Sequence, residues 1–280
     1  MKNNTNIITA TPDTPIDEII QKMQINFVKH IVIETENKPV GIVTEQDISG
    51  FLGTDKAAKT TDEIPAKQVM KKNPVTITEG KTHFSQAASH MDSLDVGSVI
   101  IVDSDKNLAG IITKTDITKA YGVVFGGKFK VKDYMSNKVF TCRESDSLGF
   151  ALNMINQNDI SRLIVTNNDG NPISVITTNT FLKHRTYAPK IQDINSENQF
   201  RADSEKMCVG DLIKHEVLYV NPEDDLSVAA KKMIKNHISG IPVVDNTSKL
   251  VGIVSNSDIV KAFVRVPLYE ELLQKYAELY

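Results

Sequence analysis

The sequence predicts an α/β (α+β) protein made of four tandem copies of one small domain. First, an eight-residue pattern, in full Gly-Ile-Val-Thr-Glu-Gln-Asp-Ile, recurs in varied form at residues 41–48, 110–117, 174–181 and 252–259. Second, the same series of strand-like and helix-like segments precedes each occurrence. Copies roughly 70 residues apart are too long for solenoid units and fit small domains.

Each copy has five expected elements. An opening strand lies around Thr9, Thr76, Thr141 or Tyr219. A polar turn follows, and then a helix whose apolar residues recur at intervals of three or four, as in 226–234. A β-branched run comes next, followed by a turn, the recurring pattern as a third strand, and a closing helix. The prediction per copy is therefore strand, helix, strand, strand, helix.

These elements resemble the cystathionine-β-synthase (CBS) domain, which works in tandem pairs called Bateman modules. The resemblance rests on the opening strand, the segment His-Ile-Ser-Gly-Ile-Pro-Val-Val-Asp at 237–245 and the closing pattern, and it extends over nearly all of residues 1–266. It implies two pseudo-twofold modules, copies one with two and three with four. We expect each to pack through the helices of its facing copies, because one copy alone exposes an apolar helical face.

The repeats also set the domain boundaries. We expect domains at residues 1–59, 66–121, 131–185 and 207–266, and a helical tail at 267–280. The stretches between the copies are polar or glycine-rich, which is typical of linkers. The tail has Leu and Tyr at helical spacing, so we expect it to pack on its own chain or on a second one.

Composition indicates a globular protein of the cytoplasm. The 280 residues are 40% hydrophobic and 24% charged, and a formal net charge of −3 gives no reason to expect nucleic acid as the main partner. The sequence has no apolar run of about 18 residues, so no membrane span is expected. Cys142 and Cys208 are isolated, which is typical of unpaired thiols in a reducing compartment.

The closing pattern first has a structural explanation. Thr or Ser followed three residues later by Asp is a capping box, which satisfies free N–H groups at a helix N-terminus. The pairs are Thr44 and Asp47, Thr113 and Asp116, and Ser255 and Asp258. A functional role is compatible with it, because a helix N-terminus beside a hydroxyl attracts anions and a carboxylate accepts two neighbouring hydroxyls.

The resemblance implies that role. In nucleotide-binding CBS domains the Thr or Ser contacts phosphate, the Asp holds the ribose, and adenine lies between the opening strand and the Ile-Pro segment. The implied sites are Thr9, Ile31, Thr44 and Asp47 in copy one; Thr76, Ile100, Thr113 and Asp116 in copy two; and Val220, Ile241, Pro242, Ser255 and Asp258 in copy four. Copy three has Thr180 in place of Asp and Ser174 in place of Gly, so we expect it to be vacant.

Phosphate also needs positive charge. In several nucleotide sensors of this family, the position two before Pro242 is basic and reaches across the pair. We take its counterparts to be Lys29, Ser98 and Arg162, with Arg162 facing copy four and Lys29 facing copy two. Arginine suits phosphate because it donates two parallel hydrogen bonds. The alternative is that both are ordinary surface cations.

Catalytic chemistry has no support in the sequence. The six histidines form no zinc-type cluster, and no phosphate-binding glycine loop or nucleophile elbow is present, so we predict neither catalytic residues nor metal ligands. The repeats occupy nearly the whole chain and leave no room for an enzyme domain.

The sequence therefore predicts a stand-alone regulatory protein that binds AMP, ADP or ATP and is expected to form a homodimer. It does not indicate which target protein is regulated. Another adenosyl compound such as S-adenosylmethionine could make the same ribose contact, so it remains an alternative ligand. A ligand-independent scaffold is the alternative from another class. A metal-linked transport regulator is less favoured, because no acidic cluster has ligand spacing.

Overall fold

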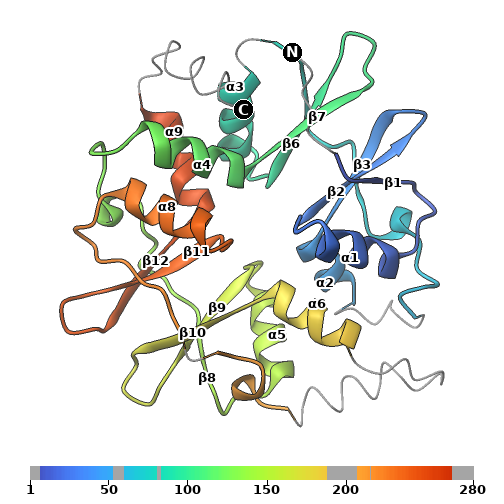
Figure 1. Cartoon of the computed structure of the whole chain (residues 1–280). Helices are drawn as coiled ribbons and strands as arrows, with labels where there is room; N and C mark the ends of the chain where they lie inside the picture. Colours follow the sequence, from blue (N-terminus) through green and yellow to red (C-terminus); the bar gives the residue numbers. More distant parts are fainter. Residues whose placement is uncertain (1–6, 53–59, 81–82, 188–206, 215, 267–280) are drawn as a thin grey trace. The chain divides into compact units, whose positions relative to one another are not determined.

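The computed structural model of the chain describes residues 7–52, 60–80, 83–187, 207–214 and 216–266 (Figure 1). The tail expected at 267–280 and most of the linker after the third copy lie outside these residues. Within them, four copies of a small mixed α/β unit follow one another along the chain, which confirms the predicted fold class.

The first three copies contain all five predicted elements. Copy one comprises β1 (Thr9–Ala10), α1 (Ile16–Ile25), β2 (His30–Thr35), β3 (Lys38–Thr44) and α2 (Glu45–Leu52). Copy two comprises β5 (Thr76–Thr78), α3 (His83–Ser93), β6 (Ser98–Val102), β7 (Leu108–Thr113) and α4 (Lys114–Val124). Copy three comprises β8 (Thr141–Arg143), α5 (Leu148–Gln157), β9 (Arg162–Thr166), β10 (Pro172–Thr177) and α6 (Thr178–Tyr187). In each, the opening strand runs parallel to the second strand, and the third strand is antiparallel to it.

Copy four lacks a full opening strand. Its elements are α8 (Leu226–Lys235), β11 (Gly240–Val244), β12 (Leu250–Ser255) and α9 (Asn256–Arg265), and Val220 forms only an isolated bridge with Val243. Proline explains the difference. The N–H groups of Ile100 and Ile164 donate to the opening segments of copies two and three, over 2.9 and 3.1 Å. Pro242 occupies the same position in copy four and has no N–H to donate.

A short lead-in precedes copies two, three and four, and each lead-in pairs with a copy other than the one that it precedes, either as a strand or through an isolated bridge. β4 (Lys71–Lys72), which follows the 3₁₀ turn η1 (Ala66–Gln68), pairs with β3 of copy one. Ser136, just after η2 (Val131–Asp133), pairs with Ile253 of copy four. Cys208, just before η3 (Val209–Asp211), pairs with Ser147 of copy three. The segment ahead of each copy is therefore structurally part of another one.

The chain forms two compact units, and each combines copies that are not consecutive. Of the described residues, the 2/4 unit contains those within 75–139 and 218–266, and the 1/3 unit contains those within 7–74 and 140–217. In the 2/4 unit, α4 packs against α8 and α9, and α3 packs against α9; in the 1/3 unit, α2 packs against α6.

The expectation that helices pack within consecutive copies is therefore wrong. The two helices of the 2/4 unit approach closely at small residues, since a Cβ added at Gly122 of α4 would lie in contact with the Cβ of Ala230 on α8, at 3.4 Å. Such complementarity belongs to a pair of helices, and no single copy reveals it.

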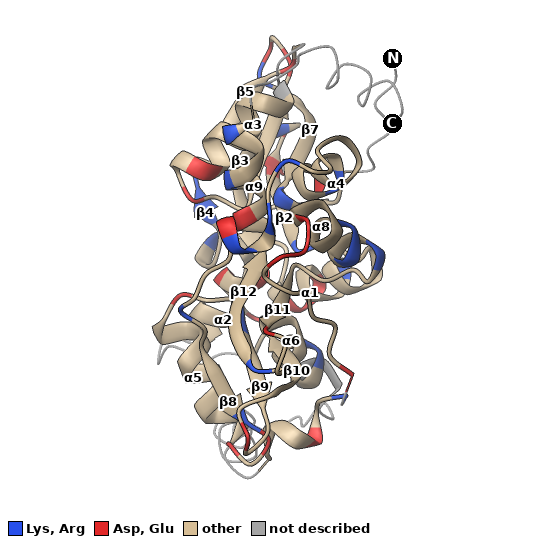
Figure 2. Ribbon diagram, turned by 90° about the vertical axis from the view of Figure 1, so that its left-hand side faces the viewer, with Lys and Arg blue, Asp and Glu red and all other residues tan. Residues whose placement is uncertain are grey.

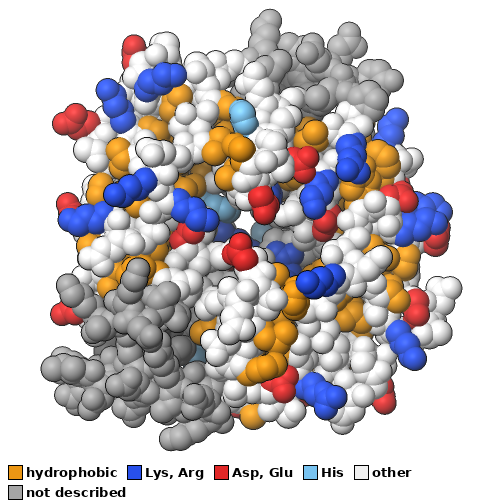
Figure 3. Space-filling model, turned by 180° about the vertical axis from the view of Figure 1, so that it is seen from behind, with side chains coloured by type: hydrophobic (Ala, Val, Ile, Leu, Met, Phe, Trp, Pro, Cys, Tyr) orange, Lys and Arg blue, Asp and Glu red, His pale blue; other side chains and the backbone are white. Residues whose placement is uncertain are grey.

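Charged residues of both signs are interspersed over the helices and strands (Figure 2), in keeping with the net charge of −3. On the face drawn in Figure 3, hydrophobic side chains form several separate groups between charged ones. None of the described helices is both long and apolar enough to cross a membrane. The described residues also contain no group of three or more His, Cys, Asp or Glu side chains arranged to hold a metal ion.

Candidate functional site

Three closing helices begin with the same carboxylate cap. The pairs are Thr44 with Asp47, Thr113 with Asp116, and Ser255 with Asp258. In each pair the N–H donates to the Asp Oδ2 atom over 2.8–2.9 Å, and the hydroxyl donates to the same oxygen over 2.6–2.7 Å. The predicted capping role is therefore confirmed. Both bonds to the cap residue use one oxygen of the carboxylate.

The third copy has a neutral version of this cap. The N–H of Thr177 donates to Thr180 Oγ1 over 3.2 Å, and the two hydroxyl oxygens lie 3.3 Å apart. These distances are longer than those to the carboxylates, as expected for neutral partners. The helix start is still capped, but it offers no negative charge.

The opening and second strands bring the remaining candidate residues side by side. Thr76 pairs directly with Ile100, and Thr9 pairs with the residue after Ile31. In copy four, the N–H of Val220 donates to the carbonyl of Pro242 over 3.1 Å. Each candidate group is therefore assembled from adjacent strands of one sheet.

The apolar members of these groups are core residues. Ile31, Ile100 and Ile241 are completely buried, and Val220 is 1% exposed. Ile31, Val220 and Ile241 belong to the core clusters of their units, whereas Ile100 alternates with the cluster residues Val99 and Ile101 and so faces the other side of its sheet.

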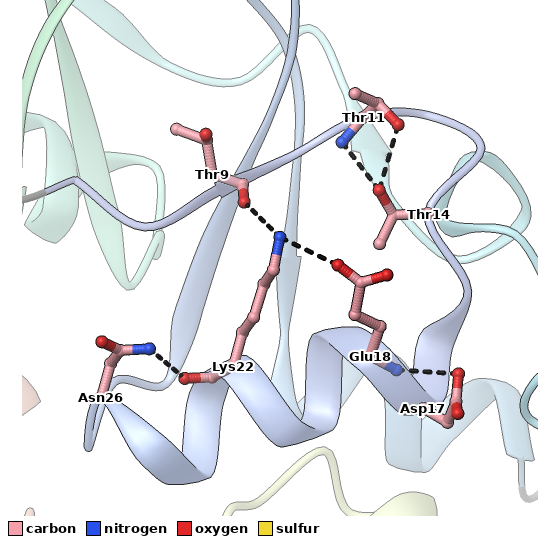
Figure 4. A network of polar contacts seen from close by, with 7 residues as sticks. All are labelled: Thr9, Thr11, Thr14, Asp17, Glu18, Lys22 and Asn26. Atoms are coloured by element: carbon pink, nitrogen blue, oxygen red, sulfur yellow. Dashed lines mark hydrogen bonds and ion pairs between the residues drawn. The ribbon is translucent and has the colours of Figure 1, made fainter.

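A lysine on the first helix holds the opening segment in copies one and four. Lys22 Nζ donates to the carbonyl of Thr9 over 3.1 Å and pairs with Glu18 at 3.1 Å (Figure 4). In copy four, Lys232 Nζ donates to the carbonyl of Tyr219 over 3.0 Å. Since each carbonyl belongs to the opening segment, these lysines place a positive charge next to the candidate sites of copies one and four.

A family model identifies the repeated unit. The model of the CBS domain matches residues 3–53, 66–123, 131–186 and 209–265, which together make up most of the chain. The chain belongs to the CBS domain family. The four copies are thus CBS motifs one to four, and the resemblance found in the sequence is confirmed.

Two archaeal proteins are similar over most of this chain. MJ1225 of Methanocaldococcus jannaschii is 24% identical over 273 residues, covering 93% of this chain and 96% of the relative. MJ1404 of the same organism is 27% identical over 262 residues, covering 91% of this chain and 59% of the relative. The crystal structure of MJ1225, described as a proposed archaeal homologue of g-AMPK, has a TM-score of 0.80 at 23% identity and covers 94% of this chain and 98% of its own. That likeness establishes a shared fold.

The strand registers correct one equivalence between the CBS motifs. Arg162 lies opposite Thr177, and Gly240 lies opposite Ser255. In motif one the residue opposite Thr44 is His30, so His30 is the counterpart of Arg162, and Lys29 precedes it by one position. The turn before the second strand is the same in all four motifs, with a left-handed residue three positions before the strand begins, at Phe27, Asp95, Asp159 and His237. Counting from the apolar run therefore placed the counterpart of Arg162 one residue too early, at Lys29.

Lys29 nevertheless belongs to a charged cluster of the 1/3 unit. Burial lowers its pKa; Glu45 opposes that shift, while Arg162 and Lys183 add to it. Burial raises the pKa of Glu45, and Lys29 and a hydrogen bond from Asn179 oppose that shift. Arg162 and Lys29 therefore lie close enough to repel each other. Their assignment to phosphate at motifs four and two stays a prediction.

The glycine of the recurring pattern has a packing role. A Cβ added at Gly41 would lie 3.2 Å from the carbonyl oxygen of Lys71, and one added at Gly252 would lie 3.1 Å from that of Ser136. In motif three, Ser174 instead donates its hydroxyl to the corresponding carbonyl, of Lys214, over 2.9 Å. The departure of motif three from the pattern therefore replaces a close contact with a hydrogen bond.

The sequence did not indicate two charged residues near these positions. Glu45 is 8% exposed and accepts a hydrogen bond from Asn179 of motif three. Lys71 pairs with Asp47 Oδ1 at 3.1 Å. One signal for Glu45 was present, because motifs two to four have Lys, Thr and Asn at its place in the pattern. Lys71 gave none, since it lies outside motif one in sequence.

Proposed function

We propose that this CBS protein is a regulatory sensor that binds adenine nucleotides, AMP, ADP or ATP, and transmits binding as a change in shape or in affinity for a target protein. The ribose would be held by the aspartates of motifs one, two and four, and phosphate by the neighbouring hydroxyl and helix N-terminus. Motif three would stay vacant. The proposal assigns the chain no catalytic step.

One observation carries this proposal. In three motifs a carboxylate at a helix N-terminus takes the bonds of its cap residue on a single oxygen. A carboxylate has about four acceptor positions, so the cap leaves capacity for further donors. A pair of ribose hydroxyls is such a donor set, and the helix N-terminus beside it favours an anion.

Calorimetric titration with AMP, ADP, ATP, adenosine and S-adenosylmethionine tests the proposal. We expect Asp258→Ala to weaken every ribose-bearing ligand at motif four by about 1.5–3 kcal/mol, or roughly ten- to a hundredfold. Asp258→Asn keeps an acceptor for the cap, so it distinguishes the effect of removing the negative charge from the effect of destabilising the helix start. Thr180→Ala, at the same position of motif three, is the matched control and should change nothing. Four nucleotides bound per chain would contradict the vacancy of motif three.

Arg162→Ala tests the assignment of phosphate. Removing this cation should weaken ATP and ADP more than adenosine, and the difference should shrink with added salt, because the attraction is electrostatic. An equal effect on ADP and adenosine would show that Arg162 does not contact the phosphate.

The scaffold alternative is favoured by the complete burial of Ile31, Ile100 and Ile241. It predicts no binding of any adenosyl compound. Native mass spectrometry of the purified protein would reveal a retained ligand and the state of oligomerisation together.

A further inference from the structure

The crossed lead-ins place three residues at one equivalent position. Lys71 pairs with Ile42 of motif one, and Ser136 pairs with Ile253 of motif four, the matching residue of the pattern. Lys214 presents its carbonyl to Ser174 of motif three. The identity of this residue differs between motifs one, three and four. In motif one it lies beside the candidate ribose carboxylate.

In motif one that residue is a cation paired with the carboxylate. Lys71 Nζ lies 3.1 Å from Asp47 Oδ1, while the cap bonds from Thr44 use Oδ2. The side chain of Asp47 is 8% exposed, and that of Lys71 is 73% exposed. Of about four acceptor positions on the carboxylate, three are thus taken, and one is too few for two ribose hydroxyls.

Motif two shows the contrasting case. Among the described residues, Asp116 receives side-chain and backbone donors only from Thr113, and both bonds go to Oδ2. About two acceptor positions are left, which matches a pair of neighbouring hydroxyls. In motif four the lead-in residue at this position is Ser136, which carries no charge.

We propose that Lys71 is an internal counterion that occupies the ribose position of motif one, so that this motif accepts a ribose-bearing ligand only by displacing the lysine. The inference rests on the proposed function and deepens it, because it ranks motif one below motif two. Motif two binds first, and motif one binds at higher ligand concentration. The identity of a lead-in residue thus sets the affinity of a motif to which it does not belong in sequence.

The test isolates motif one. In a chain carrying Asp116→Asn and Asp258→Asn, only Asp47 remains as a ribose carboxylate, and Asn preserves an acceptor for each cap. Adenosine is the probe because it is neutral, so any effect of Lys71 on phosphate is absent. We expect Lys71→Ser, which copies motif four, to tighten adenosine binding about two- to fivefold, the effect of losing an exposed ion pair worth at most about 1 kcal/mol.

Lys72→Ser is the matched control, since it removes the same charge from the neighbouring residue, and it should leave affinity unchanged. The reverse substitution, Ser136→Lys in the otherwise unsubstituted chain, should weaken motif four by a similar factor. If Lys71→Ser leaves adenosine binding unchanged or weakens it, the counterion role is wrong while the proposed function stands. Failure of the unsubstituted chain to bind any adenosyl compound overturns both.

Discussion

The two units bury their helices in different ways. In the 2/4 unit the contact has a large aromatic part: Tyr121 is fully buried, and the rings of Phe125 and Phe263 meet edge to face with centroids 5.6 Å apart. Polar bonds join the same helices, since the buried hydroxyl of Thr118 on α4 donates to Asn256 Oδ1 on α9 over 3.0 Å. One continuous core extends through both motifs. In the 1/3 unit the two motifs have separate core clusters, although Leu182 on α6 of motif three belongs to the cluster of motif one. Polar bonds also connect the two motifs. Gln46 donates to Asp159 over 2.6 Å, and Ser49 donates to Asn156 over 3.3 Å.

This difference separates two kinds of stability. Burying aromatic side chains stabilises at any pH, because no ionisation is involved. A polar contact that contains Glu45 and Lys29 carries desolvation costs which change with protonation. The aromatic part of the 2/4 contact is therefore independent of ionisation, whereas the 1/3 contact includes Glu45 and Lys29, whose pKa values are shifted by burial.

The largest predicted effect lies in the apolar contact. Phe263→Ala should cost about 3–5 kcal/mol of the free energy of unfolding, because it removes a buried ring and leaves a cavity. Ser49→Ala, in the polar contact, should cost about 0.5–1.5 kcal/mol, the value of one hydrogen bond. Guanidinium unfolding of the two variants measures both. Equal losses would contradict the distinction between the units.

The next effect concerns the residue that faces each lead-in. Gly252→Ser should destabilise by about 1–3 kcal/mol, since its Cβ would lie 2.9 Å from Met135 Sδ and close to a fixed carbonyl. Ser174→Gly in motif three should cost about 1 kcal/mol for the lost bond to Lys214. Thermal unfolding ranks the two. A stable Gly252→Ser protein would show that the lead-in shifts to make room.

A smaller effect is the pH dependence of the polar contact. Burial raises the pKa of Glu45 above its ordinary value of 4.5, so between these values the folded state binds more protons than the unfolded state. Its contribution to stability therefore falls as pH rises through that interval. Glu45→Gln should remove this fall. Urea unfolding of both proteins from acid to neutral pH measures the difference in their free energies of unfolding. If that difference does not change with pH, Glu45 makes no such contribution.

The smallest predicted effect has the opposite sign and lies in the 2/4 unit. Hydrogen bonds from Lys130 and Lys132 lower the pKa of Glu223 to about 2. Its stabilisation is therefore present above the ordinary pKa of 4.5 and is lost as pH falls toward 2. Because the three side chains are exposed, Glu223→Gln should change stability only slightly, and less at high salt. A loss of stability that does not depend on salt would indicate that Glu223 has a role beyond its bonds to Lys130 and Lys132.

Local patterns predicted what each motif contains, while the partners of each motif required the structure. The apolar spacing in 226–234 predicted α8, and Ser255 with Asp258 predicted the cap of α9. Both depend on residues a few positions apart. The packing of α4 on α8 depends on shape matching between distant segments, and the Lys71–Asp47 pair depends on which sheet a lead-in joins. Nothing in the spacing of a single copy encodes these choices.

The interleaving of copies also bears on how the chain is made. Helix α4 ends at Val124, and its partner α8 begins at Leu226, about a hundred residues later. At roughly 5–20 residues per second, the ribosome takes on the order of 5–20 s to deliver that partner. During this interval the nascent chain holds the apolar face of α4 without its final cover, so chaperone binding is expected to concentrate on the second motif.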